Sequence, residues 1–430
     1  MMRFIFAPPS VVPFCFFSRR WQQALAAVAL LWLIGTMCDE VQASPAAISD
    51  DVVKIGVMAD MSGVYATVCG EGCVTAATMA VEDFGETVLG KPIEVVSADD
   101  HNSPESAALQ AKTWVEREQV DVITGLVASS VTAAVTAVTN AAQRIVLISG
   151  SGSDAFTTSA CSPYIAHWTY DVVALANGTV KPMVEAGKKK WFFITADYAF
   201  GLALEEVATR VVTTQGGVVT GSVRVPFGTA DFAPYVRQAA ASGADVVALA
   251  NAGEDFVNAL RAAADIGLTQ SMEVVGLLVF TPNVKALDPA ITANMRLTTG
   301  FYWDRDDSSR VWSERFFARA GVMPTMVQAG VYSAVSHYLN SIRQAGSDTA
   351  DVVMKAMKST RPNDFFAQRA RLRPDGRLLH DMYQVRIKTA RERKNPDDLY
   401  AIENVVHGIV AFAPPVPSCL FRKHRATIRE

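Results

Sequence analysis

The sequence predicts an α/β protein made of two lobes, each built around a parallel β-sheet with helices on both faces. Three observations lead to this prediction. Apolar runs typical of buried strands alternate with helical patterns from residue 52 onward, and such alternation favours a parallel sheet. The same alternation begins again after Tyr170. The chain of 430 residues is also long enough to bury two sizeable cores.

The first half of the chain contains four strand-like runs separated by amphipathic segments. The runs typical of buried strands are residues 52–58, 91–98, 120–125 and 145–149. The segments with apolar residues at helical spacing are residues 73–83, 106–118 and 130–142. This order predicts one complete parallel sheet before Tyr170.

The second half repeats the pattern and then changes character. Strands are predicted at residues 191–195, 221–225, 245–250 and 273–278, and helices at residues 201–215, 232–241 and 254–266. Residues 308–346 return to long helices rich in aromatic side chains. The proline-rich stretch 413–417 predicts an irregular strap near the end of the chain.

Residues 1–43 are expected to be a signal peptide. Arg19 and Arg20 precede an apolar stretch at residues 24–34, and Ala43 completes a small-residue cleavage site. The apolar core has about 11 residues, which is short of the ~20 needed to span a bilayer. We therefore expect cleavage near Ala43 and release into the periplasm. Twin-arginine export and a lipid anchor on Cys38 are the alternatives.

Composition and cysteine content exclude several functions. The formal net charge is −4, so no basic excess attracts nucleic acid or an anionic membrane. Four of the six cysteines follow residue 43, and an even number in an oxidising compartment favours disulfides, with three possible connectivities. Cys69 and Cys73 have a spacing that also suits a metal. No histidine or third cysteine lies near them, so we expect no metal site.

One motif resembles a nucleotide-binding fingerprint. Residues 150–155 match G-x-G-x-x-A after a strand, and Asp171 follows about 20 residues later. Pro163 comes too soon for the long helix that this fingerprint opens, so nucleotide binding is not expected. The loop instead offers amides and hydroxyls that could hold a carboxylate. No H-E-x-x-H or G-x-S-x-G motif is present, and we expect neither an enzyme nor a cofactor.

Several stretches together resemble the periplasmic solute-binding proteins of the branched-chain amino-acid type, which deliver ligands to ABC importers. The similar segments are residues 54–57, 60–63, 80–83, 196–201, 250–253 and 323–330. Residues 161–163 and 167–171 resemble the subgroup that binds aromatic acids such as benzoate and hydroxycinnamate relatives. The resemblance covers nearly all of the chain after the leader.

The resemblance implies a type I binding fold with three hinge crossings, near residues 168–171, 300–303 and 373–381. Lobe 1 is then residues 50–169 plus 302–375, lobe 2 is residues 170–301 plus 376–415, and residues 416–430 form a tail. The resemblance also implies a disulfide between Cys161 and Cys419, which leaves Cys69 and Cys73 as a local pair. It further implies a monomer that meets the permease subunits of an importer.

The resemblance also implies which residues bind the ligand. Ser129 and Ser130 begin a helix after a strand, and with Ser151 and Ser153 they are expected to hold a carboxylate. A plain N-cap role is the alternative for Ser129. The expected aromatic walls of the cleft are Tyr65, Trp168, Tyr198 and Phe200. Asn251, which follows a strand, is the remaining expected ligand-binding residue.

The ligand class follows from one missing charge. Relatives that bind amino acids hold the ligand's ammonium with an acid from lobe 2, but residues 275–280 of this chain contain none. An unpaired buried ammonium is costly, so we predict a carboxylate without an α-amine, most simply an aromatic acid. Asp197 or Glu254 could supply the charge, which keeps branched-chain amino acids or amides as alternatives. A periplasmic ligand sensor is the other functional alternative.

Overall fold

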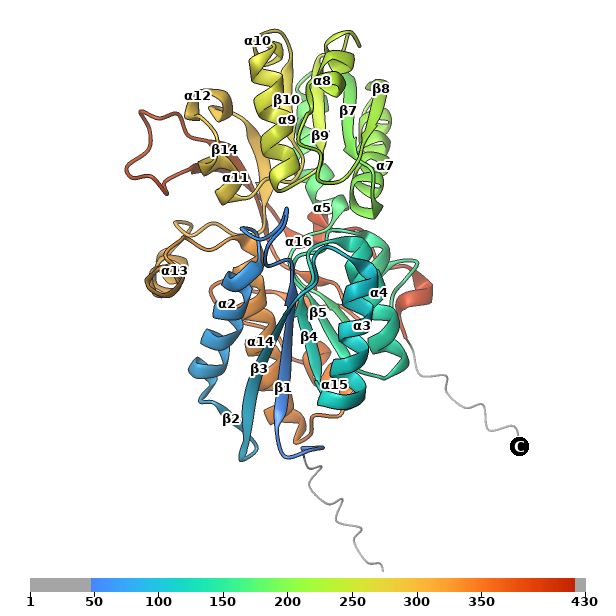
Figure 1. The fold of residues 1–430 in the computed structure, drawn as a ribbon, viewed down its shortest axis with the longest axis vertical. Helices are drawn as coiled ribbons and strands as arrows, with labels where there is room; N and C mark the ends of the chain where they lie inside the picture. Colours follow the sequence, from blue (N-terminus) through green and yellow to red (C-terminus); the bar gives the residue numbers. More distant parts are fainter. Residues whose placement is uncertain (1–47, 422–430) are drawn as a thin grey trace, which may run out of the picture. The chain divides into compact units, whose positions relative to one another are not determined.

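A computed structural model describes residues 48–421, so the predicted signal peptide and the last part of the predicted tail lie outside the described residues. Two α/β lobes are present, each with its own parallel sheet (Figure 1). Among the described residues, none of the helices combines the length and the apolar character that crossing a membrane requires.

The first lobe contains a six-stranded sheet. In spatial order its strands are β2 (Thr87–Val88), β3 (Lys91–Asp99), β1 (Val53–Ala59), β4 (Val122–Gly125), β5 (Ile145–Ile148) and β6 (Ile165–His167). All neighbouring strands are parallel except β2, which forms an antiparallel hairpin with β3. Every residue of β4 and β5 is buried, because helices cover both faces of the sheet.

Helices from two distant parts of the chain cover this sheet (Figure 1). They are α2 (Gly70–Phe84), α3 (Pro104–Thr113) continued by η1 (Trp114–Glu118), α4 (Ser129–Ala141), the short η2 (Asp154–Thr157), α13 (Asp307–Ala320), α14 (Met326–Ala345) and α15 (Ala350–Ser359). α14 packs against α2, and α3 packs against α4. The long aromatic-rich helices predicted after residue 308 are thus α13 and α14.

The second lobe has a four-stranded parallel sheet and an antiparallel sheet that the sequence did not predict. The parallel strands are β10 (Glu273–Gly276), β9 (Val246–Ala250), β7 (Lys190–Ala196) and β8 (Val218–Val225). The antiparallel strands are β11 (Arg296–Thr299), β14 (Met382–Ile387) and β15 (Tyr400–Val406). Four central residues of β15 are exposed, so its sequence lacks the apolar run by which the buried strands were recognised.

The helices of the second lobe alternate with its strands along the chain. They are α5 (Val172–Leu175), η3 (Ala176–Val180), α6 (Lys181–Glu185), α7 (Ala199–Thr214), α8 (Ala233–Ala240), α9 (Glu254–Asp265), α10 (Leu268–Ser271), α11 (Thr281–Lys285) and α12 (Pro289–Thr292). α7 packs against β7 and α8 packs against α9. The apolar faces of these helices therefore share one core with the sheet.

The chain passes between the two sheets at three neighbouring places. It leaves β6 for α5, returns after β11, and leaves again between β13 (Leu378–Leu379), which pairs with β12 (Arg371–Leu372), and β14. His380 connects these segments, because its Nε2 hydrogen-bonds the carbonyl oxygen of Thr169 and its ring lies against Gly300. Burial lowers the pKa of His380 to about 4, so this imidazole is neutral at pH 7.

The end of the chain passes back to the first lobe, a fourth passage that the predicted three crossings leave out. After β15, α16 (Gly408–Ala411) packs directly on the backbone of His380, and η4 (Pro417–Cys419) follows. Cys419 is disulfide-bonded to Cys161 of the first lobe. The predicted irregular strap thus includes one short 3-10 turn held by that bond.

Candidate functional site

Most of the residues predicted to bind a ligand gather where the carboxyl ends of the two parallel sheets face each other. Tyr65 follows β1 in the first lobe, and Tyr198 follows β7 in the second. Their hydroxyl groups hydrogen-bond to each other, so the lobes are in contact here. Gly253 allows the second lobe to approach Tyr65 closely, because a Cβ on this residue would lie only 2.9 Å from the Tyr65 ring and would clash with it. Parallel sheets commonly bind ligands at this edge.

The loop that carries Tyr65 is held in place from several sides. The buried carboxylate of Asp60 accepts the amide of Gly63 at 2.6 Å and that of Tyr65 at 2.8 Å. The loop ends at a disulfide between Cys69 and Cys73, which spans the start of α2. These bonds fix the backbone of Tyr65 and so direct its hydroxyl toward the second lobe.

Two of the four predicted serines form a buried pair. The hydroxyl of Ser151 donates to that of Ser129 at 2.9 Å, and both residues are buried. The N-cap reading of Ser129 is wrong: α4 begins at Ser129, its N-cap is Ala128, and no side chain caps it. Ser130 follows in the first turn and is partly buried. The amides of this first turn have no partner within the helix, so they and the helix dipole favour a bound anion.

The glycine-containing loop 150–155 leads into a turn and not into a nucleotide-binding helix. It ends in the short η2, where the Ser153 hydroxyl accepts the amide of Ala155 at 3.3 Å. Asp171, 20 residues further on, caps α5 by accepting the amide of Ala174 at 2.8 Å. Asp171 therefore has a local structural role as the cap of α5. Ser153 is also buried, but its hydroxyl is already bonded to the amide of Ala155.

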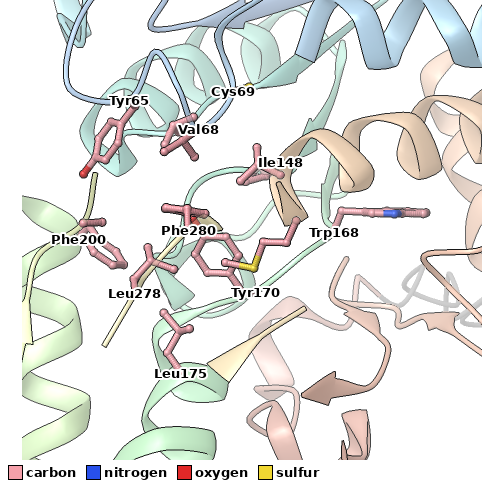
Figure 2. Close-up of a cluster of buried hydrophobic side chains, with 14 of the residues drawn as sticks. Tyr65, Val68, Cys69, Ile148, Trp168, Tyr170, Leu175, Phe200, Leu278 and Phe280 are labelled. Carbon is pink, nitrogen blue, oxygen red and sulfur yellow. The ribbon is translucent and has the colours of Figure 1, made fainter. Parts of the chain in front are cut away.

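Trp168 does not join the other predicted aromatic residues, and its assignment as a wall of the cleft is wrong. Its side chain is fully buried in the first lobe, where its indole nitrogen donates to the Ser333 hydroxyl at 3.0 Å. Its ring packs on His337 with centroids 5.5 Å apart. Figure 2 shows Trp168 well apart from Tyr65 and Phe200. Its position next to a hinge did not determine where its side chain points.

An aromatic cluster occupies the contact between the lobes. The ring of Phe227 lies 4.9 Å from that of Tyr198 and 5.6 Å from that of Tyr65, and Phe200 lies 6.1 Å from Tyr198. Phe200 also contacts Gly152 of the first lobe. Burial raises the pKa of both tyrosines, which are therefore neutral hydrogen-bonding groups at pH 7. The sequence reading missed Phe227, because it lies in a loop after β8 without a distinguishing motif.

The same cluster continues toward the hinge (Figure 2). Tyr170 and Phe280 approach edge to face, with ring centroids 6.3 Å apart. Leu278 and Phe280 come from the segment after β10 that contains no acid, and both are buried. The walls of the site are therefore mostly apolar and aromatic.

Several buried polar atoms of the second lobe have no protein partner among residues 48–421. Those beside the lobe contact include both amide atoms of Asn251 and the Oδ1 atom of Asp255. Both residues are at most 2% exposed, and they flank Gly253, which touches Tyr65. Because buried polar groups are nearly always hydrogen-bonded, these atoms are suited to contact a ligand.

Asp255 is a buried lobe 2 carboxylate that could pair with a ligand ammonium, and the sequence analysis did not identify it. Burial raises the pKa of its carboxyl to about 6, and its second oxygen accepts the amide of Gly228 at 3.2 Å. Its charge acts on the pKa of both Tyr65 and Tyr198, which indicates that it lies near them. Asp197, named earlier as an alternative, is exposed, as is Glu254. Because the second lobe does hold a buried acid beside these tyrosines, the lack of an acid in residues 275–280 does not exclude a ligand with an ammonium group.

Two sizeable cavities lie away from this cluster. One, of about 400 Å³, is lined by residues of α14 and the loop 360–364, and another, of about 360 Å³, lies between α6 and the antiparallel sheet. None of the predicted ligand-binding residues lines either cavity. We place the candidate site at the lobe contact instead, because residues that follow six strands (β1, β4, β5, β7, β8 and β9) lie there, among them side chains with unpartnered polar atoms.

Comparison with known proteins identifies the family and the fold of the chain. A sequence model of the family described as periplasmic binding protein matches residues 52–393. The chain belongs to this family. The match confirms the resemblance and the type I two-lobe fold inferred from the sequence, and places the chain among binding proteins and not enzymes.

Solved periplasmic binding proteins resemble the chain over most of its length. One from Burkholderia mallei is 42% identical, with a TM-score of 0.83, and the match covers 84% of this chain and 96% of that one. A branched chain amino acid ABC transporter periplasmic ligand-binding protein from Burkholderia xenovorans is 33% identical, with a TM-score of 0.76, over 84% and 97% of the two chains.

Two relatives with lower sequence identity have names that mention a ligand. A solute binding protein of an ABC transporter from Rhodopseudomonas palustris, in complex with 3,4-dihydroxy benzoic acid, shares the fold at 20% identity and a TM-score of 0.76, over 84% and 98% of the chains. The Leu/Ile/Val-binding protein homolog 6 of Brucella melitensis is 26% identical over 54% of this chain. The chain matches only 58% of the length of that curated relative.

Proposed function

We propose that this protein is the periplasmic solute-binding component of an ABC importer, and that it captures a small aromatic carboxylate with a ring hydroxyl by closing its two lobes. The observation that carries the proposal is the pair of unpartnered buried side chains Asn251 and Asp255, which flank the Gly253 that touches Tyr65. The first lobe contributes the serines at the start of α4. The ligand favours the closed state through contacts that the open state cannot make.

The two ends of the site suit the two ends of such a ligand. The carboxylate is held by Ser129, Ser130 and Ser151 together with the free amides of α4. The ring lies among Tyr65, Tyr198, Phe200 and Phe227, and its hydroxyl donates to Asp255 or Asn251. The relative that holds a dihydroxybenzoic acid supports this ligand class. In this proposal the leader is cleaved near Ala43 and the mature monomer docks on the permease subunits.

A branched-chain amino acid is the second candidate, and Asp255 is the observation that favours it. A buried carboxylate with one free oxygen can pair with an α-ammonium as well as with a hydroxyl. The Burkholderia xenovorans relative is described as a branched chain amino acid transporter component, which also supports this candidate.

A ligand panel separates the two candidates. Thermal shift and calorimetry of the mature protein are measured with benzoate, hydroxybenzoates and hydroxycinnamates, and with leucine, isoleucine and valine. We expect hydroxybenzoates to bind about tenfold more tightly than benzoate, because a hydrogen bond to a charged group contributes about 1.5–3 kcal/mol. Stabilisation by the amino acids alone would replace the first candidate with the second.

Replacing Ser130 with alanine is expected to weaken binding of the carboxylate by about 1–3 kcal/mol, because one donor to a charged group is lost. Calorimetry of Ser130→Ala measures this loss. Ser336→Ala is the matched control, since Ser336 is a partly buried helical serine of the same lobe that lies on α14. An unchanged affinity in Ser130→Ala would contradict the carboxylate clamp.

The pH dependence of affinity tests the role of Asp255. Its pKa in the free protein is raised to about 6, so a proton competes with any ligand that needs the ionised carboxyl. An ammonium ligand lowers that pKa on binding, and its affinity is expected to fall about tenfold as pH decreases from 7.5 to 5. A hydroxyaromatic acid is expected to lose less than about threefold, because a protonated Asp255 can still hydrogen-bond its neutral hydroxyl. A tenfold loss for the hydroxyaromatic acid contradicts the neutral contact.

A further inference from the structure

Three carboxylates meet at the end of the first lobe that lies opposite the candidate ligand site. Asp50 precedes β1, Asp121 precedes β4, and Asp348 lies between α14 and α15. One oxygen from each residue lies within 4.8 Å of the other two. Asp121 and Asp348 are buried, and Asp50 is exposed. The amino ends of β1 and β4 thus carry a concentrated negative charge.

The positive charge that offsets this cluster is small. The Arg144 guanidinium donates to Asp121 Oδ1 at 2.9 Å, and it is the one ion-pair partner of the three acids among residues 48–421. Backbone and hydroxyl donors supply further bonds, from Lys54 N to Asp121 at 2.9 Å and from the Ser49 amide and hydroxyl to Asp348, each at 2.7 Å. One cation against three carboxylates leaves a formal charge of about −2 when all three are ionised.

A buried tyrosine provides a second and independent observation. The Tyr338 side chain on α14 is fully buried, and its hydroxyl has no hydrogen-bond partner within the part of the chain that the structure describes. Burial raises the pKa of Tyr338, and the charges of Asp121 and Asp348 raise it further, so this hydroxyl lies near the acidic cluster. A fully buried hydroxyl without a partner is rare, and a water bound to an ion is one group that would satisfy it.

We propose that Asp50, Asp121 and Asp348 bind a divalent cation of the calcium type, with the Tyr338 hydroxyl donating to a water on that cation. Carboxylate and water oxygens are the ligands that Ca²⁺ prefers, and its irregular coordination tolerates acids from three separate segments. Zinc prefers nitrogen and sulfur ligands, which this cluster lacks. The bound ion ties the chain entering β1 to the base of the sheet and to the α14–α15 turn.

The cation is therefore a stabilising group of the first lobe, separate from the solute site. The mature protein is stripped with a chelator, and its thermal unfolding and calorimetric binding are measured with Ca²⁺ or Mg²⁺ in the absence of solute. We expect about 2 mM Ca²⁺ to raise the melting temperature by about 3 °C, given a Kd near 0.1 mM as in extracellular modules. Mg²⁺ is expected to bind more weakly, because it demands octahedral geometry.

Two variants, each with one carboxylate replaced by the isosteric amide, test two of the three proposed ligands. Asp50→Asn changes an exposed side chain and is expected to abolish the Ca²⁺-dependent shift, as is Asp348→Asn. Glu94→Gln is the matched control, because it removes one exposed carboxylate from β3 of the same lobe and is expected to keep the full shift. The proposal is overturned if the stripped wild-type protein binds neither ion, or if Asp50→Asn and Asp348→Asn respond to Ca²⁺ as the wild type does.

Discussion

Removing the disulfide between Cys161 and Cys419 is expected to lower the free energy of unfolding by about 5 kcal/mol. The two residues are 258 positions apart in the sequence, so the bond restricts the unfolded chain over most of its length. Loop-closure entropy increases with the length of the closed loop, and this loop is long. The measurement is urea unfolding of the mature protein with both cysteines replaced by alanine. Trp fluorescence monitors the unfolding, and the wild-type protein is the reference.

The second disulfide of the same protein is the control. Cys69 and Cys73 are separated by 4 positions, so the same relation predicts a smaller loss of about 2 kcal/mol when they are replaced. Replacing the local pair is instead expected to weaken ligand binding, because that bond closes the loop that carries Tyr65. Equal losses of stability for the two pairs would show that loop length is not what makes the long-range bond important.

Replacing Arg377 with methionine is expected to lower the free energy of unfolding by about 3–5 kcal/mol, because a buried charge is left without its partner. The guanidinium is fully buried at the hinge and lies 3.7 Å from the Asp171 carboxylate. It donates to the carbonyl oxygens of Tyr170 at 3.2 Å and Leu378 at 3.1 Å, and it stacks over the Phe412 ring at 4.2 Å. Three segments of the hinge region therefore depend on one side chain.

Burial disfavours the charged form of both residues, and the charge of each partner opposes this effect. Burial lowers the pKa of Arg377 to about 10 and raises the pKa of Asp171. Without the guanidinium, the Asp171 carboxylate would be buried and uncompensated. Urea unfolding of Arg377→Met and of Arg377→Lys measures the effect, and the lysine variant is expected to lose less because it keeps the charge.

A double-mutant cycle separates the ion pair from simple packing. Asp171→Asn keeps an oxygen that can cap α5 by accepting the Ala174 amide, but it removes the negative charge. The variant with both Arg377→Met and Asp171→Asn is expected to be more stable than the sum of the single losses predicts, because no lone charge remains. Strict additivity of the two changes would mean that the pair does not interact energetically.

The positions of most strands and helices could be predicted from residue pattern alone, because local burial leaves a periodic signature. The predicted strand at residues 52–58 is β1 at Val53–Ala59, and the predicted helix at residues 254–266 is α9 at Glu254–Asp265. The antiparallel strands β11, β14 and β15 were missed. β15 is mostly exposed, and β11 has only four residues, so neither carries a long apolar run.

Within the candidate site, the positions after strands could be predicted, because parallel strands bring their carboxyl ends to one edge. This reasoning found Ser129, Ser151, Tyr65 and Tyr198, which the structure brings to that edge from both lobes. It did not predict the direction of a side chain. Trp168 lies at the same edge in sequence, yet its ring enters the core of the first lobe beside His337.

The remaining features depend on contacts between residues that are far apart in the chain. Asp255 reaches the site from the start of α9 and not from the segment after β10, so a search of one strand could not find it. Asp50, Asp121 and Asp348 come together only when the base of the first sheet meets the end of α14. Sequence pattern therefore determined the elements and their order, because these follow from local burial. Tertiary packing alone decided which charges and hydroxyls meet, because those distances depend on how separate segments fold against each other.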